Sequence, residues 1–150
     1  MQLRIGLTRS TRGTMRVKRV KPHEIPLRLL EQKKVWDLRV FYEFAVVRGH
    51  EWWAYVADEG DEDDPCAAFI ITDNPLYRAV ACTTIIVDKA RRTPERVAQV
   101  AILAHEYTLA LGRKLGRKYA GCAVKNPEKF IELLGNPEIE ILEHFVREEV

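Results

Sequence analysis

An apolar strand that leads into a long amphipathic helix and then a second strand is the feature that most constrains this chain. Residues 79–87 (AVACTTIIV) are rich in β-branched side chains and nearly uncharged, which predicts a strand buried on both faces. Apolar residues then recur at helical spacing from Val97 to Leu115, and a short apolar run, YAGCAV, follows at residues 119–124. Because a strand–helix–strand connection brings two parallel strands together, this segment predicts an α/β domain with a parallel strand pair.

Local signals mark where the two helices of this segment begin and end. Thr93 is suited to cap the start of the long helix, and Pro94 suits its first turn. Gly116 fits a left-handed cap at the other end, where the surrounding Arg and Lys residues complement the helix dipole. Residues 127–135 (PEKFIELLG) predict a second helix that ends at Gly135.

A hairpin is predicted upstream of this segment. Residues 52–57 (WWAYVA) and 66–72 (CAAFIIT) read as strands, and the polar segment DEGDEDDP joins them around Gly60. Six acidic residues in or beside this segment suggest calcium, which prefers oxygen ligands. The segment lacks the alternating acid spacing of a calcium loop, so a solvated hairpin tip is favoured.

Other parts of the chain give weaker signals. Residues 15–20 alternate as a half-exposed strand does, and residues 22–34 predict a helix. Residues 35–47 fit either a helix or a strand. Residues 137–149 begin with strand-like alternation but also fit a helical stripe, so both structures remain open.

Composition favours one domain with a basic start. At 150 residues and 47% hydrophobic, the chain can bury one core. Residues 1–21 carry seven Arg or Lys residues and no acid. We therefore interpret residues 1–14 as a basic N-terminal arm and residues 15–150 as a single domain. The arm is either a targeting segment, a nucleic-acid-binding arm or a short tail leading into the first strand, and the last is favoured.

Three cysteines, Cys66, Cys82 and Cys122, lie far apart in the sequence. Their number and spacing favour neither a disulfide framework nor a metal site, and a reduced, cytoplasmic setting fits them best. No apolar run is long enough to span a membrane. The segment AHEYTLALG resembles a zinc-protease motif, but Leu109 stands where the second His would be. We therefore expect no metal, and a partly buried His105 beside an exposed Glu106.

Taken together, the layout of residues 15–135 resembles that of the GNAT superfamily of acyl-CoA-dependent N-acetyltransferases. The phrases TTIIVDKARR and GRKLGRKYAGCAVKNPEKFIELLG carry the resemblance. It implies a GNAT-like α/β fold: a mixed, mostly antiparallel sheet with a parallel, splayed strand pair, flanked by helices.

The resemblance also implies a place for acetyl-CoA. In that family a loop with a basic residue and spaced glycines follows the central strand, and its backbone N–H groups hold the cofactor pyrophosphate. Here Arg92 takes the basic position, while Glu95 and Val97 stand where the glycines belong. Arginine side chains would have to replace the missing backbone cradle. The implied cofactor-binding residues are Ile86, Val87, Arg91, Arg92, Arg96 and Asn126.

The family's frequent general acid is also missing. A Tyr commonly lies four residues before the Gly that ends the last helix, and here that position is Ile131. The resemblance therefore implies a divergent protein with an eroded acyl-CoA site and a binding or structural role, a kind that occurs among phage virion components. The alternative is an active acetyl-CoA-dependent N-acetyltransferase acting on an amine, with Glu43 or Glu51 accepting the amine proton. Nucleic-acid binding through the basic arm is a minor alternative.

Overall fold

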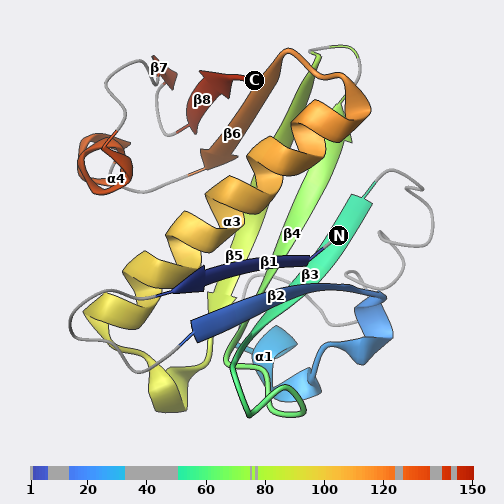
Figure 1. The fold of residues 1–150 in the computed structure, drawn as a ribbon, viewed down its shortest axis with the longest axis vertical. Helices are drawn as coiled ribbons and strands as arrows, with labels where there is room; N and C mark the ends of the chain where they lie inside the picture. Colours follow the sequence, from blue (N-terminus) through green and yellow to red (C-terminus); the bar gives the residue numbers. More distant parts are fainter. Residues whose placement is uncertain are drawn as a thin grey trace.

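One sheet organises the described part of the chain in the computed structural model, which describes residues 2–6, 14–32, 51–74, 76, 78–123, 127–135, 140–142 and 145–150. Its eight strands lie in the order β1-β2-β3-β4-β5-β6-β8-β7 (Figure 1). The strands are β1 (Gln2–Gly6), β2 (Thr14–Val20), β3 (Glu51–Asp58), β4 (Ala67–Asn74), β5 (Ala79–Val87), β6 (Tyr119–Ala123), β7 (Glu140–Leu142) and β8 (Phe145–Glu149). The α-helices are α1 (Leu27–Leu30), α3 (Pro94–Leu115) and α4 (Pro127–Leu134), and short 3-10 helices cover Pro22–Glu24 and Lys89–Arg91.

The strand directions confirm the predicted mixed sheet. β5 and β6 are parallel, and every other neighbouring pair among the described strands is antiparallel. The expected hairpin is β3 and β4. The expected strand–helix–strand unit is β5, α3 and β6, with α3 lying across the sheet in Figure 1.

The parallel pair separates part-way along β5. Among the described residues, the pairing of β5 with β6 runs from Ala79 to Cys82, whereas β5 continues to Val87 beside β4. At this point β5 also bulges, because Ile71 pairs with Cys82 while the preceding Ile70 pairs with Thr84. A bulge bends its strand and increases the local twist, so it turns the end of β5 away from β6. This separation, which we call the fork, is the predicted splay.

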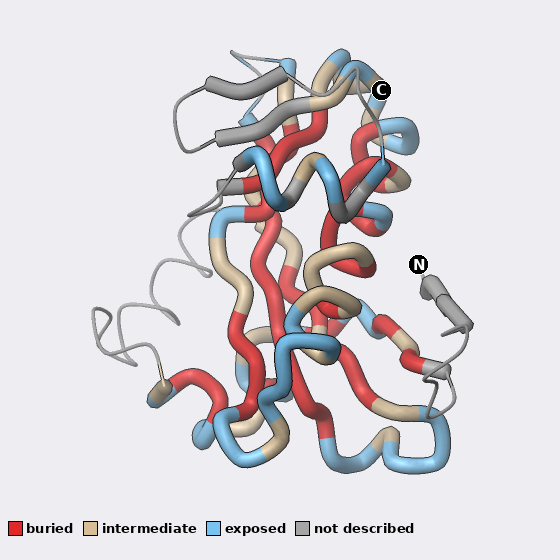
Figure 2. Tube along the Cα trace, turned by 90° about the vertical axis from the view of Figure 1, so that its left-hand side faces the viewer, coloured by how far each residue is buried: buried red, intermediate tan, exposed pale blue. Residues whose placement is uncertain are grey.

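Two apolar clusters cover the two faces of the sheet. The larger cluster joins α3 to the sheet through buried residues such as Val100, Leu103 and Tyr107. The smaller cluster packs Leu29 and Leu30 of α1 against the opposite face. Figure 2 shows the buried residues continuing along the central strands and the inner side of α3, with exposed residues at the turns.

Helix α3 begins and ends as predicted. The Thr93 hydroxyl accepts a hydrogen bond from the Arg96 N–H at 3.1 Å, and Pro94 is the first helical residue. Gly116 caps the other end with a φ of 69°, in the left-handed region that favours glycine. Gly112 lies where the helix touches the sheet, since an added Cβ would meet Val80 Cγ2 at 3.2 Å.

Other segments differ from the sequence-based expectations. Residues 22–34 were expected to form a helix, but only the 3-10 turn and the single turn of α1 form within the described part, because Pro26 interrupts the backbone hydrogen bonds. Five residues of the proposed arm, Gln2–Gly6, pair with β2 as an edge strand of the sheet. The open question at 137–149 is answered by strands β7 and β8 in its described part. Residues 35–47 lie outside the described residues. No helix in the described ranges is both long and apolar enough to cross a membrane.

Candidate functional site

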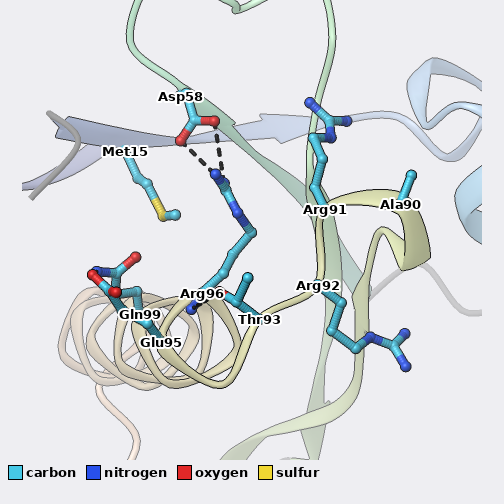
Figure 3. A pocket seen from close by; sticks show the side chains of 9 residues that line it. All are labelled: Met15, Asp58, Ala90, Arg91, Arg92, Thr93, Glu95, Arg96 and Gln99. Carbon is cyan, nitrogen blue, oxygen red and sulfur yellow. Dashed lines mark hydrogen bonds and ion pairs between the residues drawn. The ribbon is translucent and has the colours of Figure 1, made fainter.

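A cavity of about 270 Å³ lies where β5 leads into α3 (Figure 3). This region, residues 87–96, is called the junction below. Its cavity is lined by Met15, Asp58, Ala90, Arg91, Arg92, Thr93, Glu95, Arg96 and Gln99. All three arginines expected from the sequence to bind pyrophosphate therefore reach one cavity. It lies beside the first turn of α3, where the helix dipole favours anions.

Several backbone amides of the junction are hydrogen-bonded to side chains of the protein. The Asp88 side chain caps the 3-10 turn by accepting from the Ala90 N–H at 3.1 Å. The Lys89 N–H donates to Gln32 Oε1 at 2.9 Å, and the Arg96 N–H donates to Thr93. Three amide groups of the junction are thus engaged by side chains of the protein, and one of them, that of Arg96, belongs to the expected pyrophosphate loop.

The Arg91 side chain is held by carboxylates and a carbonyl. Its guanidinium donates to Asp88 Oδ2 at 2.8 Å, to the Pro65 carbonyl at 2.7 Å and to Asp64 Oδ1 at 3.4 Å. Arg28 of α1 joins this network through Asp64 Oδ1 at 2.7 Å. Arg91 therefore ties the junction to the β3–β4 hairpin and does not project as a free cation.

Arg96 and Arg92 are also engaged, and they point in different directions. Arg96 Nη1 donates to both carboxylate oxygens of Asp58 at 3.1 Å. Arg92 Nη2 donates to the Val87 carbonyl at 2.7 Å. Figure 3 shows Arg96 directed at Asp58, with Arg91 and Arg92 turned away from it and from each other. Because their charges do not converge on one point, they do not form a preorganised phosphate clamp.

Hydrogen bonding at the junction perturbs its ionisable groups. Burial alone would raise the pKa of Asp88, but the hydrogen bonds from Arg91 and the Ala90 N–H outweigh it and hold that pKa below its ordinary value. Burial alone would lower the pKa of Arg96, and the hydrogen bond to Asp58 raises it instead. Both shifts favour the charged forms, so the ion pairs persist at neutral pH.

The acidic hairpin has a role that the sequence did not reveal. We expected a solvated tip, and Asp64 remains 64% exposed. However, Glu59 and Glu62 pair with Arg16, and Asp64 pairs with Arg28 and Arg91. Among the described residues no group of acidic, His or Cys side chains could hold a metal ion, so the calcium alternative finds no support there.

The remaining residues predicted to bind the cofactor or to accept the amine proton do not gather at one place. Ile86 and Val87, two of the implied cofactor-binding residues, are 3% and 5% exposed, and the Val87 carbonyl accepts from Gln32 Nε2 at 2.8 Å. Glu51 lies at the opposite end of β3 from the junction, where its carboxylate accepts from the Trp53 indole at 3.4 Å. Asn126 and Glu43 lie outside the described residues.

The last helix follows the predicted register. Gly135 has a φ of 69°, and its N–H donates to the Ile131 carbonyl at 2.9 Å. Ile131 packs against the larger apolar cluster. The position of the expected thiolate-protonating Tyr is thus a helical residue whose side chain carries no proton to donate.

In the zinc-protease-like segment Glu106 is exposed as predicted, but His105 is fully buried and not partly buried. His105 is 2% exposed, and its Nε2 lies 2.8 Å from Glu148 Oε2, while Glu106 is exposed. The three cysteines are free and buried. Sequence reasoning did not connect His105 with Glu148, because they lie on α3 and β8, 43 residues apart, and meet only through tertiary packing.

Comparison with known proteins bears on the fold. No protein-family model matches the chain, and no curated protein matches it. Solved structures, in contrast, do match this chain. A putative acetyltransferase, yncA, from Salmonella typhimurium with its cofactor acetyl-CoA aligns at a TM-score of 0.61 and 8% identity over 90% of this chain and 93% of that one. An acetyltransferase from Bacillus subtilis in complex with CoA aligns at 0.57 and 11% identity, over 91% and 99% of the two chains.

A third neighbour is FdhC, described as a nucleotide-linked sugar GNAT, at a TM-score of 0.59 and 11% identity over 90% of this chain and 86% of that one. This chain has the GNAT fold. The family resemblance seen in residues 15–135 is therefore confirmed for the architecture, including the mixed sheet and its parallel, splayed pair. At such low identity the likeness concerns the fold alone, so function has to be argued from this chain's own residues.

Proposed function

We propose that this protein is a divergent GNAT-fold protein with an eroded acyl-CoA site, and that it acts by binding a macromolecular partner or as a structural component. A place in a phage virion is one such structural role. The observation that carries the proposal is that arginine side chains of the junction already form ion pairs with carboxylates of the protein itself. Asp58, Asp64 and Asp88 already pair with Arg91 and Arg96, two of the three arginines that would hold a pyrophosphate.

Binding of a pyrophosphate there would require these pairs to break. An anion near α3 would have to displace Asp58 from Arg96 and would also meet the exposed carboxylate of Glu95 at the edge of the cavity. Like charges so close together disfavour a second anion. Glycine would allow close approach of a phosphate to the backbone, whereas Glu95 and Val97 carry side chains at those positions.

An active N-acetyltransferase is the alternative, and the cavity favours it. Arg91, Arg92 and Arg96 all line it beside the start of a 22-residue helix, and β5 leaves β6 beyond Cys82 as a pantetheine arm would need. Two of the similar structures are named with CoA or acetyl-CoA, so this fold accommodates that cofactor. Activity would then rest on orienting the amine beside the thioester, with no general acid at Ile131.

Isothermal titration calorimetry of the full chain with acetyl-CoA, with free CoA as a second ligand, tests the proposal. Arg92→Ala and Lys89→Ala form a matched pair, because both residues are exposed cations of the junction and only Arg92 lines the cavity. We expect no binding of either ligand at millimolar concentration. Micromolar binding that Arg92→Ala abolishes and Lys89→Ala preserves would overturn the eroded-site proposal and support acetyl transfer.

A further inference from the structure

A second cavity, of about 250 Å³, lies against β2 and β3 outside the junction. It is lined by Arg16, Lys18, Tyr55, Ala57, Glu62 and Asp63. Met15 and Asp58 lie opposite each other in β2 and β3, and both line the junction cavity. The next pair, Arg16 and Ala57, lines the second cavity. Because successive side chains of a strand point to opposite faces, the two cavities lie on opposite faces of the sheet.

The floor of the second cavity is formed by neighbouring residues of the two strands. Lys18 lies opposite Tyr55, and Arg16 lies opposite Ala57, so these four residues share one face. Tyr55 packs against the smaller apolar cluster, and Ala57 is buried. The floor therefore has an apolar centre on β3 beside two cationic side chains on β2.

The β3–β4 hairpin supplies an acidic wall. Arg16 holds the hairpin beside β2, since its Nη1 lies 3.5 Å from Glu62 Oε1 and its Nη2 donates to Glu59 Oε1 at 3.2 Å. The hairpin turn is closed by its own backbone, because the Asp64 N–H donates to the Asp61 carbonyl at 2.9 Å. The wall that carries Glu62 and Asp63 is thus fixed in place over the floor.

Three polar groups of this cavity have no partner within the described part of the chain. The Lys18 ammonium and the Asp63 carboxylate are exposed, and neither forms an ion pair with a described residue. The Nε atom of Arg16 is buried and has no hydrogen-bond acceptor there. A buried donor without an acceptor destabilises a fold, and native proteins commonly satisfy such a donor with water or a ligand.

The free charges are separated along the strands. Ala57 is nearer to the hairpin than Tyr55, so Lys18 lies farther from the acidic wall than Arg16 does. Residues two apart on one strand are separated by about 6.6 Å. The cavity therefore has a free carboxylate at its hairpin end and a free ammonium at its other end, with Arg16 between them.

From this arrangement we propose that the second cavity binds a small zwitterion of the α-amino acid class. The ammonium of the ligand binds Asp63, its carboxylate accepts from Arg16 Nε and from Lys18, and its side chain lies against Tyr55. An anion alone would be repelled by the acidic wall and a cation alone by Lys18, so a ligand with both charges fits both ends.

The size of the cavity and its position agree with such a ligand. Sites for drug-sized ligands occupy roughly 300–1,000 Å³, so a cavity of about 250 Å³ suits a smaller molecule. The cavity includes no residue of the junction, residues 87–96. The proposal therefore goes beyond the proposed function and is independent of whether acetyl-CoA binds.

Chemical-shift mapping of the isotope-labelled full chain with L-leucine tests the proposal. The same titration is run with isopentylamine, which lacks the carboxylate of leucine, and with isocaproate, which lacks its ammonium. We expect leucine to bind at millimolar concentration and to shift the amide signals of residues 16–18, 55–57 and 62–63. Each analogue should bind at least about tenfold more weakly, because one charged end of the cavity then has no partner.

Two matched pairs of variants assign the binding to this cavity. Lys18 and Lys89 are both exposed lysines, and only Lys18 lines the cavity. Asp63 and Asp61 are both exposed acids of the hairpin, and only Asp63 lines it. We expect Lys18→Met and Asp63→Asn each to weaken leucine binding about tenfold, and Lys89→Met and Asp61→Asn to leave it unchanged.

The unperturbed signals of each spectrum show whether a variant is folded, so the titrations report on binding. An absence of shifts at the cavity residues with leucine at the highest concentration would overturn the proposal. Equal binding of leucine and either analogue would do the same, since the site would then recognise one charge only. Equal weakening by the matched controls would assign the effect to the overall charge of the protein and would also contradict the site.

Discussion

The junction and the fork lie at two points along β5, and the ionisable side chains in these two regions have opposite environments. At the end of β5, the arginines and aspartates of the junction are numerous, partly exposed and paired with each other. At the fork, halfway along β5, four ionisable side chains lie in a largely buried environment: Cys82, His105, Cys122 and Glu148.

The difference lies in what the protein environment does to each charge. Pairing at the junction stabilises the ionised states that Asp88 and Arg96 already have at neutral pH, so the charges act as structural ties. At the fork, the pKa of Cys122 is shifted to about 6, which changes the protonation state at neutral pH. Strongly perturbed groups mark functional sites more often than satisfied ones do. The comparison therefore directs attention from the family's cofactor loop to the centre of the sheet.

Removing Asp88 should produce the largest effect on stability. Asp88→Ala deletes the cap of the 3-10 turn and leaves Arg91 with fewer partners, so we expect a loss of about 2–3 kcal/mol in the free energy of unfolding. Urea denaturation of the purified variant measures it. Asp61→Ala on the exposed hairpin is the control and should change the free energy by less than about 0.5 kcal/mol. Equal, small effects would show that the junction is not held by its ion pairs.

The same variant gives a test in acid. The folded-state pKa of Asp88 lies below its ordinary value of 3.8, so in acid the unfolded chain binds more protons than the folded one at this site. Its contribution to stability is present at neutral pH and is lost as the pH falls below about 4. The stability gap between wild type and Asp88→Ala should therefore narrow in acid. A gap that stays constant from pH 7 to about pH 3 would contradict the assigned pairing.

A double-mutant cycle across Arg96 and Asp58 should give the next largest effect. The two side chains are 16% and 27% exposed, so the pair is partly protected from water. We expect a coupling energy of about 1–2 kcal/mol from denaturation of Arg96→Ala, Asp58→Ala and the double variant. A coupling near zero would mean that Arg96 is available for a ligand, which would favour the acetyltransferase alternative.

How far the sequence predicts this structure depends on the range of the interactions. Thr93 and Gly116 mark the ends of α3 through contacts within a few residues, so the sequence predicts them directly. The helix expected at residues 22–34 was wrong because Pro26 outweighs the apolar spacing around it. The strands at the C-terminal end are stabilised by pairing with β6, which no local pattern encodes.

The same distinction applies to the two sites. Arg91, Arg92 and Arg96 were predicted to gather at one place because the family resemblance puts the cofactor loop there, and they do line one cavity. Their partners Asp58 and Asp64 come from a hairpin about 30 residues away, so their engagement could not be predicted from spacing. The splay that forms the fork was predicted, but the meeting of Cys82 and Cys122 there was not, because it depends on the register of β5 and β6.

Loss of the α3 cap should have a smaller effect on stability than loss of the junction pairs. Thr93→Ala removes the hydroxyl that accepts from the Arg96 N–H, and an N-cap of this kind contributes about 1 kcal/mol. Thermal unfolding followed by circular dichroism measures the change, and Thr93→Ser, which keeps the hydroxyl, should restore most of it. A Thr93→Ser variant as unstable as Thr93→Ala would show that the methyl group, not the cap, matters here.

The smallest expected signal comes from the fork, where one thiol titrates without unfolding the protein. Cys82 on β5 and His105 on α3 act on Cys122, and His105 in turn contacts Glu148 on β8. Because the pKa of Cys122 is lowered to about 6, its thiol is protonated below that pH and becomes a thiolate above it. The ultraviolet thiolate absorbance of the native protein should therefore rise by one thiolate around pH 6, and this step should be absent in Cys122→Ser and kept in Cys66→Ser. If the absorbance rises only above pH 8, as it does for thiols with an ordinary pKa, Cys122 is an inert core residue. The fork would then differ from the junction only in how deeply its side chains are buried.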